Sequence, residues 1–230
     1  MIRAVLTDIE GTTTSVAFVF EVLFPYARSR LRDFLATHSA EPAVRAQMDA
    51  VAEAVGQPLS DAQIAAQLEQ WIDQDRKVTP LKALQGMLWA EGYRRGDFTG
   101  HVYPDAALWL RRWHDAGIEL YVYSSGSVQA QRLLFGHSDA GDLTPLFNGY
   151  FDTTSGAKRA VESYRHIAAQ IGRPPAEILF LSDMVEELDA ARAAGMHTAR
   201  LVRDAAAAPD AAHPEVGDFS QIRLDAPDAA

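Results

Sequence analysis

Short runs of apolar residues, separated by segments with helical periodicity, constrain the fold of this chain most strongly. The apolar runs lie at residues 4–6, 118–123, 178–181 and 198–202. Apolar, β-branched and aromatic runs of this length are typical of parallel strands covered on both faces. Helical patterns lie between the later runs, at residues 104–116, 157–171 and 186–194. The alternation predicts an α/β protein with a doubly wound, Rossmann-like parallel sheet.

Residues 14–100 interrupt this alternation, because they show helical patterns only. Residues 18–35 are amphipathic, Ser60 is placed to cap a helix with Ile64 and Leu68 on one face, and Thr79-Pro80 begins another helix. A helical block of this length is too long to be a crossover between two strands. We therefore expect an α/β hydrolase core of residues 1–13 and 101–230, with residues 14–100 as an inserted helical cap domain.

The C-terminal part of the chain has two further features. Residues 204–215 are rich in Ala, Pro and Asp, which predicts a linker. Residues 216–222 are expected to add a strand at the edge of the sheet.

The composition excludes several classes of protein. The chain has 21 Lys and Arg against 31 Asp and Glu, a formal net charge of −10, which disfavours binding to nucleic acid or to anionic membranes. It has no cysteine, so a disulfide scaffold, a cysteine nucleophile and a thiolate metal site are excluded. The apolar run before Asp8 is too short for a signal peptide, and no run approaches about 18 residues, the length of a membrane span. These features predict a cytoplasmic protein.

Polar residues follow three of the predicted strands. Asp8 and Glu10 follow the first, Ser124 and Ser125 the second, and Asp183 the third. Because ligands of open α/β sheets bind at the carboxyl ends of the strands, these side chains are expected to meet at one edge.

This set of residue types suits phosphoryl chemistry. Carboxylates without a soft ligand select a hard cation, and Mg²⁺ fits best. The segment Ser124-Ser125-Gly126 before a helix offers hydroxyls and backbone N–H groups to a phosphate. Lys158 is the candidate cation for the phosphoryl oxygens.

Each of these residues has an ordinary structural interpretation when taken alone. Asp8 suits a turn, Ser124 and Asp183 suit helix caps, and Lys158 suits an exposed surface. Their common position after successive strands favours one phosphoryl-transfer site. The seven histidines lack metal-ligand spacing, and the chain contains no P-loop, no GxGxxG and no GxSxG motif.

In these motifs the chain resembles the haloacid dehalogenase-like hydrolases. The family's DxDGT motif is matched by Asp8-Ile9-Glu10-Gly11-Thr12, and its other three motifs by Ser124, Lys158 and Ser182-Asp183. The resemblance covers residues 1–13 and 101–222. Glu10 replaces the usual second Asp, and together with the segments around Ser124, Lys158 and Asp183 it resembles the enolase-phosphatase branch of methionine salvage.

The resemblance implies an activity and a role for each site residue. The substrate would be 2,3-diketo-5-methylthiopentyl 1-phosphate, a small phosphorylated metabolite, which a Mg²⁺-dependent monomer would enolise and dephosphorylate to an acireductone. Asp8 would be the nucleophile, Glu10 the acid and base, and Lys158, with Ser124 and Ser125, would hold the phosphoryl group. Asp8, Glu10 and Asp183 would bind the metal, and Glu187 would orient a metal-bound water.

Two alternative functions stay open on the sequence. The first is another phosphatase, or a dehalogenase, of the same fold. The second is a non-catalytic protein that uses the pocket to bind phosphate.

Overall fold

The computed structural model describes residues 1–203 and 212–224. They form two compact units, one of residues 1–16 with the chain from residue 100 onward, the other of residues 17–99. Most of the predicted linker at 204–215 lies outside the described residues. None of the described helices is long and apolar enough to cross a membrane.

The first unit contains a parallel sheet. Its described strands are β1 (Ala4–Thr7), β2 (Glu119–Tyr123), β3 (Gly149–Phe151), β4 (Ile178–Ser182), β5 (His197–Leu201) and β6 (Glu215–Val216). The strands lie in the order β3-β2-β1-β4-β5-β6, and every neighbouring pair is parallel. This arrangement confirms the predicted doubly wound α/β fold.

Two details of the sheet differ from the sequence expectation. Strand β3 was not expected, because it has three residues and begins with a glycine instead of an apolar run. The expected edge strand at 216–222 is mostly wrong. Only Glu215–Val216 pairs with β5, and residues 219–221 form the 3₁₀ turn η5, whose first turn the Asp218 side chain caps.

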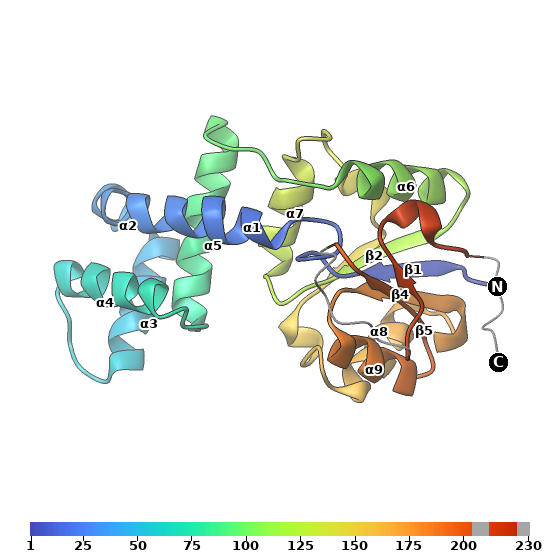
Figure 1. Cartoon of the computed structure of the whole chain (residues 1–230). Helices are drawn as coiled ribbons and strands as arrows, with labels where there is room; N and C mark the ends of the chain where they lie inside the picture. The colour runs from blue at the N-terminus through green and yellow to red at the C-terminus, as the bar shows by residue number, and fades with distance from the viewer. Residues whose placement is uncertain (204–211, 225–230) are drawn as a thin grey trace. The chain divides into compact units, whose positions relative to one another are not determined.

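Four α-helices accompany the sheet: α6 (Pro104–Asp115), α7 (Val128–Gly136), α8 (Val161–Ile171) and α9 (Val185–Ala193). In Figure 1, α6 lies on one side of the sheet, and α8 and α9 lie on the other. Buried Leu6, Phe180, Tyr164 and Leu188 belong to one apolar core shared by β1, β4, α8 and α9. This core holds the central strands in place.

Helix α8 begins later than the sequence predicts. The expected segment was 157–171, but the helix starts at Val161, because Ala160 has an extended backbone. Residues 157–160 form a turn closed by the Ala160 N–H, which donates to the Ala157 carbonyl. Lys158 therefore lies in a turn before the helix.

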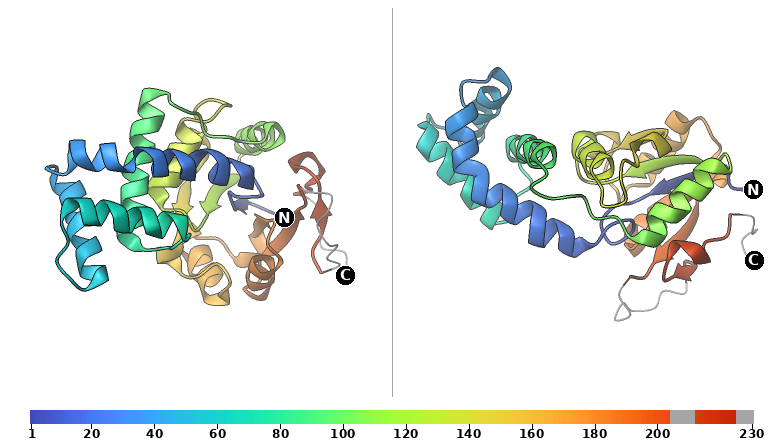
Figure 2. Two further views of the ribbon diagram at one scale, coloured as in Figure 1. Left: turned by 60° about the vertical axis from the view of Figure 1, so that its left-hand side comes forward. Right: turned by 90° about the horizontal axis from the view of Figure 1, so that it is seen from above.

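The second unit is entirely helical. Helix α1 (Val16–Phe18) begins with the last residue of the first unit's N-terminal segment and continues into the second. The elements that follow it are the π-helix η1 (Val19–Leu23), α2 (Phe24–His38), α3 (Pro42–Val55), α4 (Asp61–Asp73) and α5 (Thr79–Arg95). Their apolar faces share one core with Leu31, Met48, Leu68 and Leu84 fully buried. In both views of Figure 2 the blue and green helices of this unit lie against one another. Its role as a cap domain stays a prediction.

The expected cap at Ser60 is confirmed. The Ser60 side chain accepts a hydrogen bond from the Gln63 backbone N–H, and the Ser60 backbone N–H donates one to the Gln63 side-chain oxygen. This capping box satisfies two backbone donors at the start of α4.

Arg203, just beyond β5, ties the C-terminal part of the sheet to the turn after β1. Its guanidinium donates to the Thr12 carbonyl at 2.8 and 3.1 Å and pairs with Asp105 at 2.9 Å. It also lies over the Tyr103 ring, 4.1 Å from the ring centroid. Because its side chain is only 12% exposed, these contacts are largely shielded from water.

Arg203→Ala is expected to lower the free energy of unfolding by about 2 kcal/mol, because it leaves the Thr12 carbonyl without its donor and removes the cation that pairs with Asp105. Chemical denaturation measures this loss. The control is Arg165→Ala, whose exposed pair with Glu162 is expected to contribute less than about 0.5 kcal/mol. Equal stability of the two variants would contradict this account of Arg203.

Candidate active site

The candidate site lies at the carboxyl ends of three adjacent strands. β1 stands between β2 and β4, so the residues that follow these strands meet at one edge. β1 is also where the strand order reverses, since β2 and β3 extend the sheet on one side and β4 to β6 on the other. Open α/β sheets bind their ligands at this switch point. The topology therefore brings Asp8, Ser124 and Asp183 to the position that the sequence predicts.

Asp8 sits in a tightly bonded turn. Its backbone N–H donates to the Leu181 carbonyl of β4, and its own carbonyl accepts from the Thr7 and Thr13 hydroxyls at 2.9 and 3.2 Å. The side chain is buried, with the residue only 5% exposed. These bonds hold the Asp8 backbone while its carboxylate faces the site.

Gly11 allows the turn to approach Asp183. Its φ is +70°, and a Cβ at this position would lie 2.3 Å from the nearer Asp183 carboxylate oxygen. Both the left-handed backbone and the lack of space require glycine here. The Asp183 carboxylate thus packs against the turn that carries Asp8 and Glu10.

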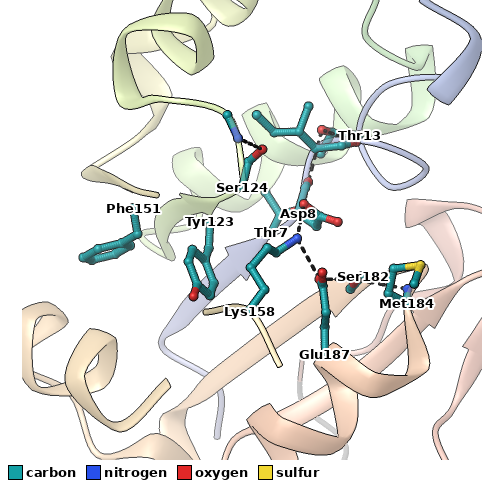
Figure 3. A network of polar contacts seen from close by, with 12 residues as sticks. Thr7, Asp8, Thr13, Tyr123, Ser124, Phe151, Lys158, Ser182, Met184 and Glu187 are labelled. Atoms are coloured by element: carbon teal, nitrogen blue, oxygen red, sulfur yellow. Dashed lines mark hydrogen bonds and ion pairs between the residues drawn. The ribbon is translucent and has the colours of Figure 1, made fainter. Parts of the chain in front are cut away.

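Lys158 joins two carboxylates at the centre of the site. Its ammonium Nζ lies 2.6 Å from Asp8 Oδ1 and 2.7 Å from Glu187 Oε2 (Figure 3). Ser182 donates to the same Glu187 oxygen at 3.0 Å. The Glu187 carboxylate thus binds the Lys158 ammonium, and its expected role in orienting a metal-bound water stays a prediction. Glu186, by contrast, is exposed.

Burial and mutual repulsion disfavour the charged forms of two acids in the site. Burial, followed by the charge of Asp8, raises the pKa of Asp183 to about 6. The same two causes raise the pKa of Glu187 to about 7, against the opposing effect of Lys158. Burial would lower the pKa of Lys158, but Asp8 and Glu187 together raise it. Lys158 opposes the rise of both carboxyl pKa values and does not cancel either.

Ser124 and Ser125 follow β2 and differ in exposure. Ser124 is buried, and its Oγ accepts from the Gly126 N–H at 3.1 Å, which leaves its own proton for donation. Ser125 is exposed and lines the cavity. Ser127, one residue further on, caps α7 through the Ala130 N–H.

These residues surround a cavity of about 510 Å³. Of the sequence-predicted residues, its lining includes Asp8, Glu10, Ser125, Lys158 and Asp183, and does not include the buried Ser124. Sequence reasoning missed Val16, Thr153, Arg159 and Met184, which complete the lining together with Ala157 and Glu187. Arg159 and Met184 directly follow motif residues, so proximity along the chain was the one signal that pointed to them.

The donor set fits a Mg²⁺ ion. In residues 1–203 and 212–224, no three His, Cys, Asp or Glu side chains form a ready metal-ligand group. Mg²⁺ is commonly held by one or two carboxylates, with water and substrate phosphate completing its shell. The buried Asp183, whose pKa rises beside Asp8, is a carboxylate that a cation would stabilise in its charged form.

The chain matches known proteins along most of its length. The family model of the haloacid dehalogenase-like hydrolases matches residues 2–195. A protein of Pseudomonas aeruginosa (strain UCBPP-PA14) named enolase-phosphatase E1 is 60% identical over 96% of this chain and 98% of its own. A protein of the same name from Methylococcus capsulatus is 57% identical over 97% and 98%.

Solved structures agree with this relationship. The crystal structure of the Unknown transcript 4 protein of Saccharomyces cerevisiae is 33% identical, with a TM-score of 0.80 over 96% of this chain and 100% of its own. A dehalogenase with a TM-score of 0.57, at 19% identity, shares the fold. The chain therefore belongs to the haloacid dehalogenase-like hydrolases and, within them, to the enolase-phosphatases.

Proposed function

We propose that this protein is a Mg²⁺-dependent enolase-phosphatase. It converts 2,3-diketo-5-methylthiopentyl 1-phosphate and water to the acireductone 1,2-dihydroxy-3-keto-5-methylthiopentene and phosphate. The observation that carries the proposal is Asp8, buried at a strand end beside Lys158 in the cavity. The name of relatives that are 56–61% identical supports the choice of substrate.

In the proposed reaction Asp8 is the nucleophile. Its carboxylate oxygen attacks phosphorus, the bond from phosphorus to the substrate oxygen breaks, and an aspartyl-phosphate forms. The Glu10 carboxyl gives its proton to the leaving oxygen. It then takes a proton from the water that cleaves the aspartyl-phosphate and regenerates Asp8. Glu10 is exposed at the cavity lining, where it can reach both the leaving group and water.

The remaining residues bind and neutralise the phosphoryl group. Lys158, Ser124 and Ser125 donate hydrogen bonds to its oxygens and stabilise the charge that develops there. Asp8, Asp183 and Glu10, the last through its carbonyl or carboxylate, would hold Mg²⁺. When bound, the ion would offset the repulsion between the anionic nucleophile and the anionic substrate. The monomeric state and the cytoplasmic location stay predictions from the sequence.

A substrate panel with Mg²⁺ tests the proposed function. The diketo phosphate is expected to give enol absorbance before phosphate is released, and sugar phosphates are expected to react far more slowly. Faster turnover of a sugar phosphate would favour another phosphatase of this fold. Binding of phosphate without any turnover would favour the non-catalytic protein.

Asp8→Asn is expected to reduce phosphate release by about a thousandfold or more, since the amide is a poor nucleophile. A phosphate-release assay measures the loss, and circular dichroism checks that the fold is kept. Asp115→Asn, on an exposed side chain of α6, serves as the control and is expected to keep wild-type activity. Near wild-type turnover by Asp8→Asn would remove Asp8 from the role of nucleophile.

Asp183→Asn is expected to raise the Mg²⁺ concentration needed for half-maximal activity at least about tenfold, because a neutral amide binds the cation more weakly. Titration of activity with Mg²⁺ after treatment with EDTA measures this change. The matched control is Asp189→Asn, a half-exposed carboxylate of α9. An unchanged Mg²⁺ requirement in Asp183→Asn would show that Asp183 does not bind the metal.

A further inference from the structure

The segment that carries Lys158 is held by three side-chain hydroxyls. Tyr123 donates its phenolic O–H to the Gly156 carbonyl at 3.0 Å. Ser163 donates to the Ala157 carbonyl at 2.8 Å, and Tyr164 donates to the Lys158 carbonyl at 2.6 Å. Three successive backbone carbonyls thus each accept a hydrogen bond from a different side chain.

This segment belongs to no helix or strand. The side-chain hydroxyls therefore supply its carbonyls with the hydrogen bonds that backbone N–H groups supply in a helix or sheet. It lies between the 3₁₀ turn η3 (Thr153–Ser155) and α8. Gly156 has φ of +125°, a conformation that side chains other than glycine rarely adopt, and its Cβ would lie 2.2 Å from the Ser163 hydroxyl oxygen. Glycine at position 156 therefore leaves the space that the Ser163 hydroxyl occupies beside the backbone before Lys158.

The two tyrosines that hold the segment are themselves fixed. Both are fully buried, Tyr123 at the end of β2 and Tyr164 in α8. Their rings meet edge to face with centroids 5.5 Å apart, and the Tyr164 ring packs against Phe180 of β4 at 5.1 Å. The Tyr123 hydroxyl thus joins the Lys158 turn to β2, and the Tyr164 hydroxyl joins it to α8, whose Tyr164 ring packs on β4.

Tyr123 also faces the lysine side chain. The Lys158 ammonium lies 5.8 Å from the centroid of its ring, and Figure 3 shows the two side chains next to each other. The Lys158 side chain is only 11% exposed. Its backbone is bound by one tyrosine, and its ammonium is faced by another.

A lysine side chain is flexible, so the place of its ammonium depends on where its backbone is held. A shift of about 1 Å in a reacting group can cost about a hundredfold in rate. We propose that Tyr164, together with Tyr123 and Ser163, is a positioning residue that sets the Lys158 ammonium against the phosphoryl group. This inference rests on the proposed function in one respect, which is that Lys158 binds the phosphoryl oxygens of the substrate.

The test uses Tyr164→Phe, which removes one hydroxyl and keeps the ring packing. With p-nitrophenyl phosphate as substrate, kcat is expected to fall about tenfold with a smaller change in KM. The inhibition constant of orthovanadate, an oxyanion that would engage the same ammonium, is expected to rise by a similar factor. Ser163→Ala gives a second, smaller side-chain deletion with the same expected direction.

The matched control is Tyr150→Phe, in β3 of the same unit. The Tyr150 hydroxyl is buried but makes no hydrogen bond to the part of the chain that the structure describes. This variant is expected to keep wild-type kcat and orthovanadate inhibition, so it separates the loss of a buried hydroxyl from the loss of the bond to Lys158.

A second background shows whether Tyr164 acts through the lysine. In Lys158→Ala, orthovanadate binding measured by calorimetry is expected to be weak and to stay the same when Tyr164→Phe is added. Two results would overturn the inference. One is a Tyr164→Phe variant that has a lower Tm but keeps the kcat and the orthovanadate inhibition constant of the wild type. The other is an undiminished Tyr164→Phe effect on orthovanadate binding in the Lys158→Ala background.

A separate measurement, the comparison of two substrates, tests the proposed function. If the wild-type protein hydrolyses p-nitrophenyl phosphate but not the diketo phosphate, the substrate assignment is wrong. The ratio of Tyr164→Phe to wild type is then still measurable and still decides the role of Tyr164.

Discussion

The contact on which the rest of the site depends is the buried ammonium of Lys158 between Asp8 and Glu187. Contacts of 2.6 and 2.7 Å place one positive charge between two carboxylates that come from different elements, the turn after β1 and helix α9. Such a buried cluster is weak evidence for stability, because the cost of removing the ions from water offsets their mutual attraction. The cluster is better understood as an arrangement that prepares charge for a ligand.

The electrostatics of the surrounding acids point the same way. The pKa values of Asp183 and Glu187 rise because burial and the charge of Asp8 act together. A cation that binds near these carboxyl groups stabilises their ionised forms. The Lys158 ammonium in turn attracts the anionic phosphoryl group of a substrate. The same cavity thus offers carboxylates that suit a metal ion and an ammonium that suits an anion. Phosphoryl transfer requires this combination.

The scaffold explains why this arrangement is precise. β1 stands between β2 and β4, and its turn is held by the Thr7 and Thr13 hydroxyls. Gly11 lets Asp183 approach, and Arg203, which follows β5 two strands away from β1, binds the Thr12 carbonyl. The Lys158 turn has no ladder of its own and takes its hydrogen bonds from Tyr123, Ser163 and Tyr164. Residues that carry the chemistry therefore sit on backbone that several distant elements hold.

Much of this could be predicted from the sequence, because strand periodicity and the residues after each strand are local properties. They determined the α/β class, four of the strands, and the candidates Asp8, Glu10, Ser124, Ser125, Lys158 and Asp183, of which all but the buried Ser124 line the cavity. Local pattern did not reveal β3, whose three residues lack an apolar run, or the late start of α8, where Ala160 has an extended backbone. Only the tertiary structure decided that Glu187 binds Lys158 and that Tyr123 and Tyr164 hold its turn. Glu187 and Tyr123 are distant in the chain from the residues they contact, and Tyr164 lies only six residues from Lys158. In both cases no spacing along the sequence encodes which side chain will meet which partner.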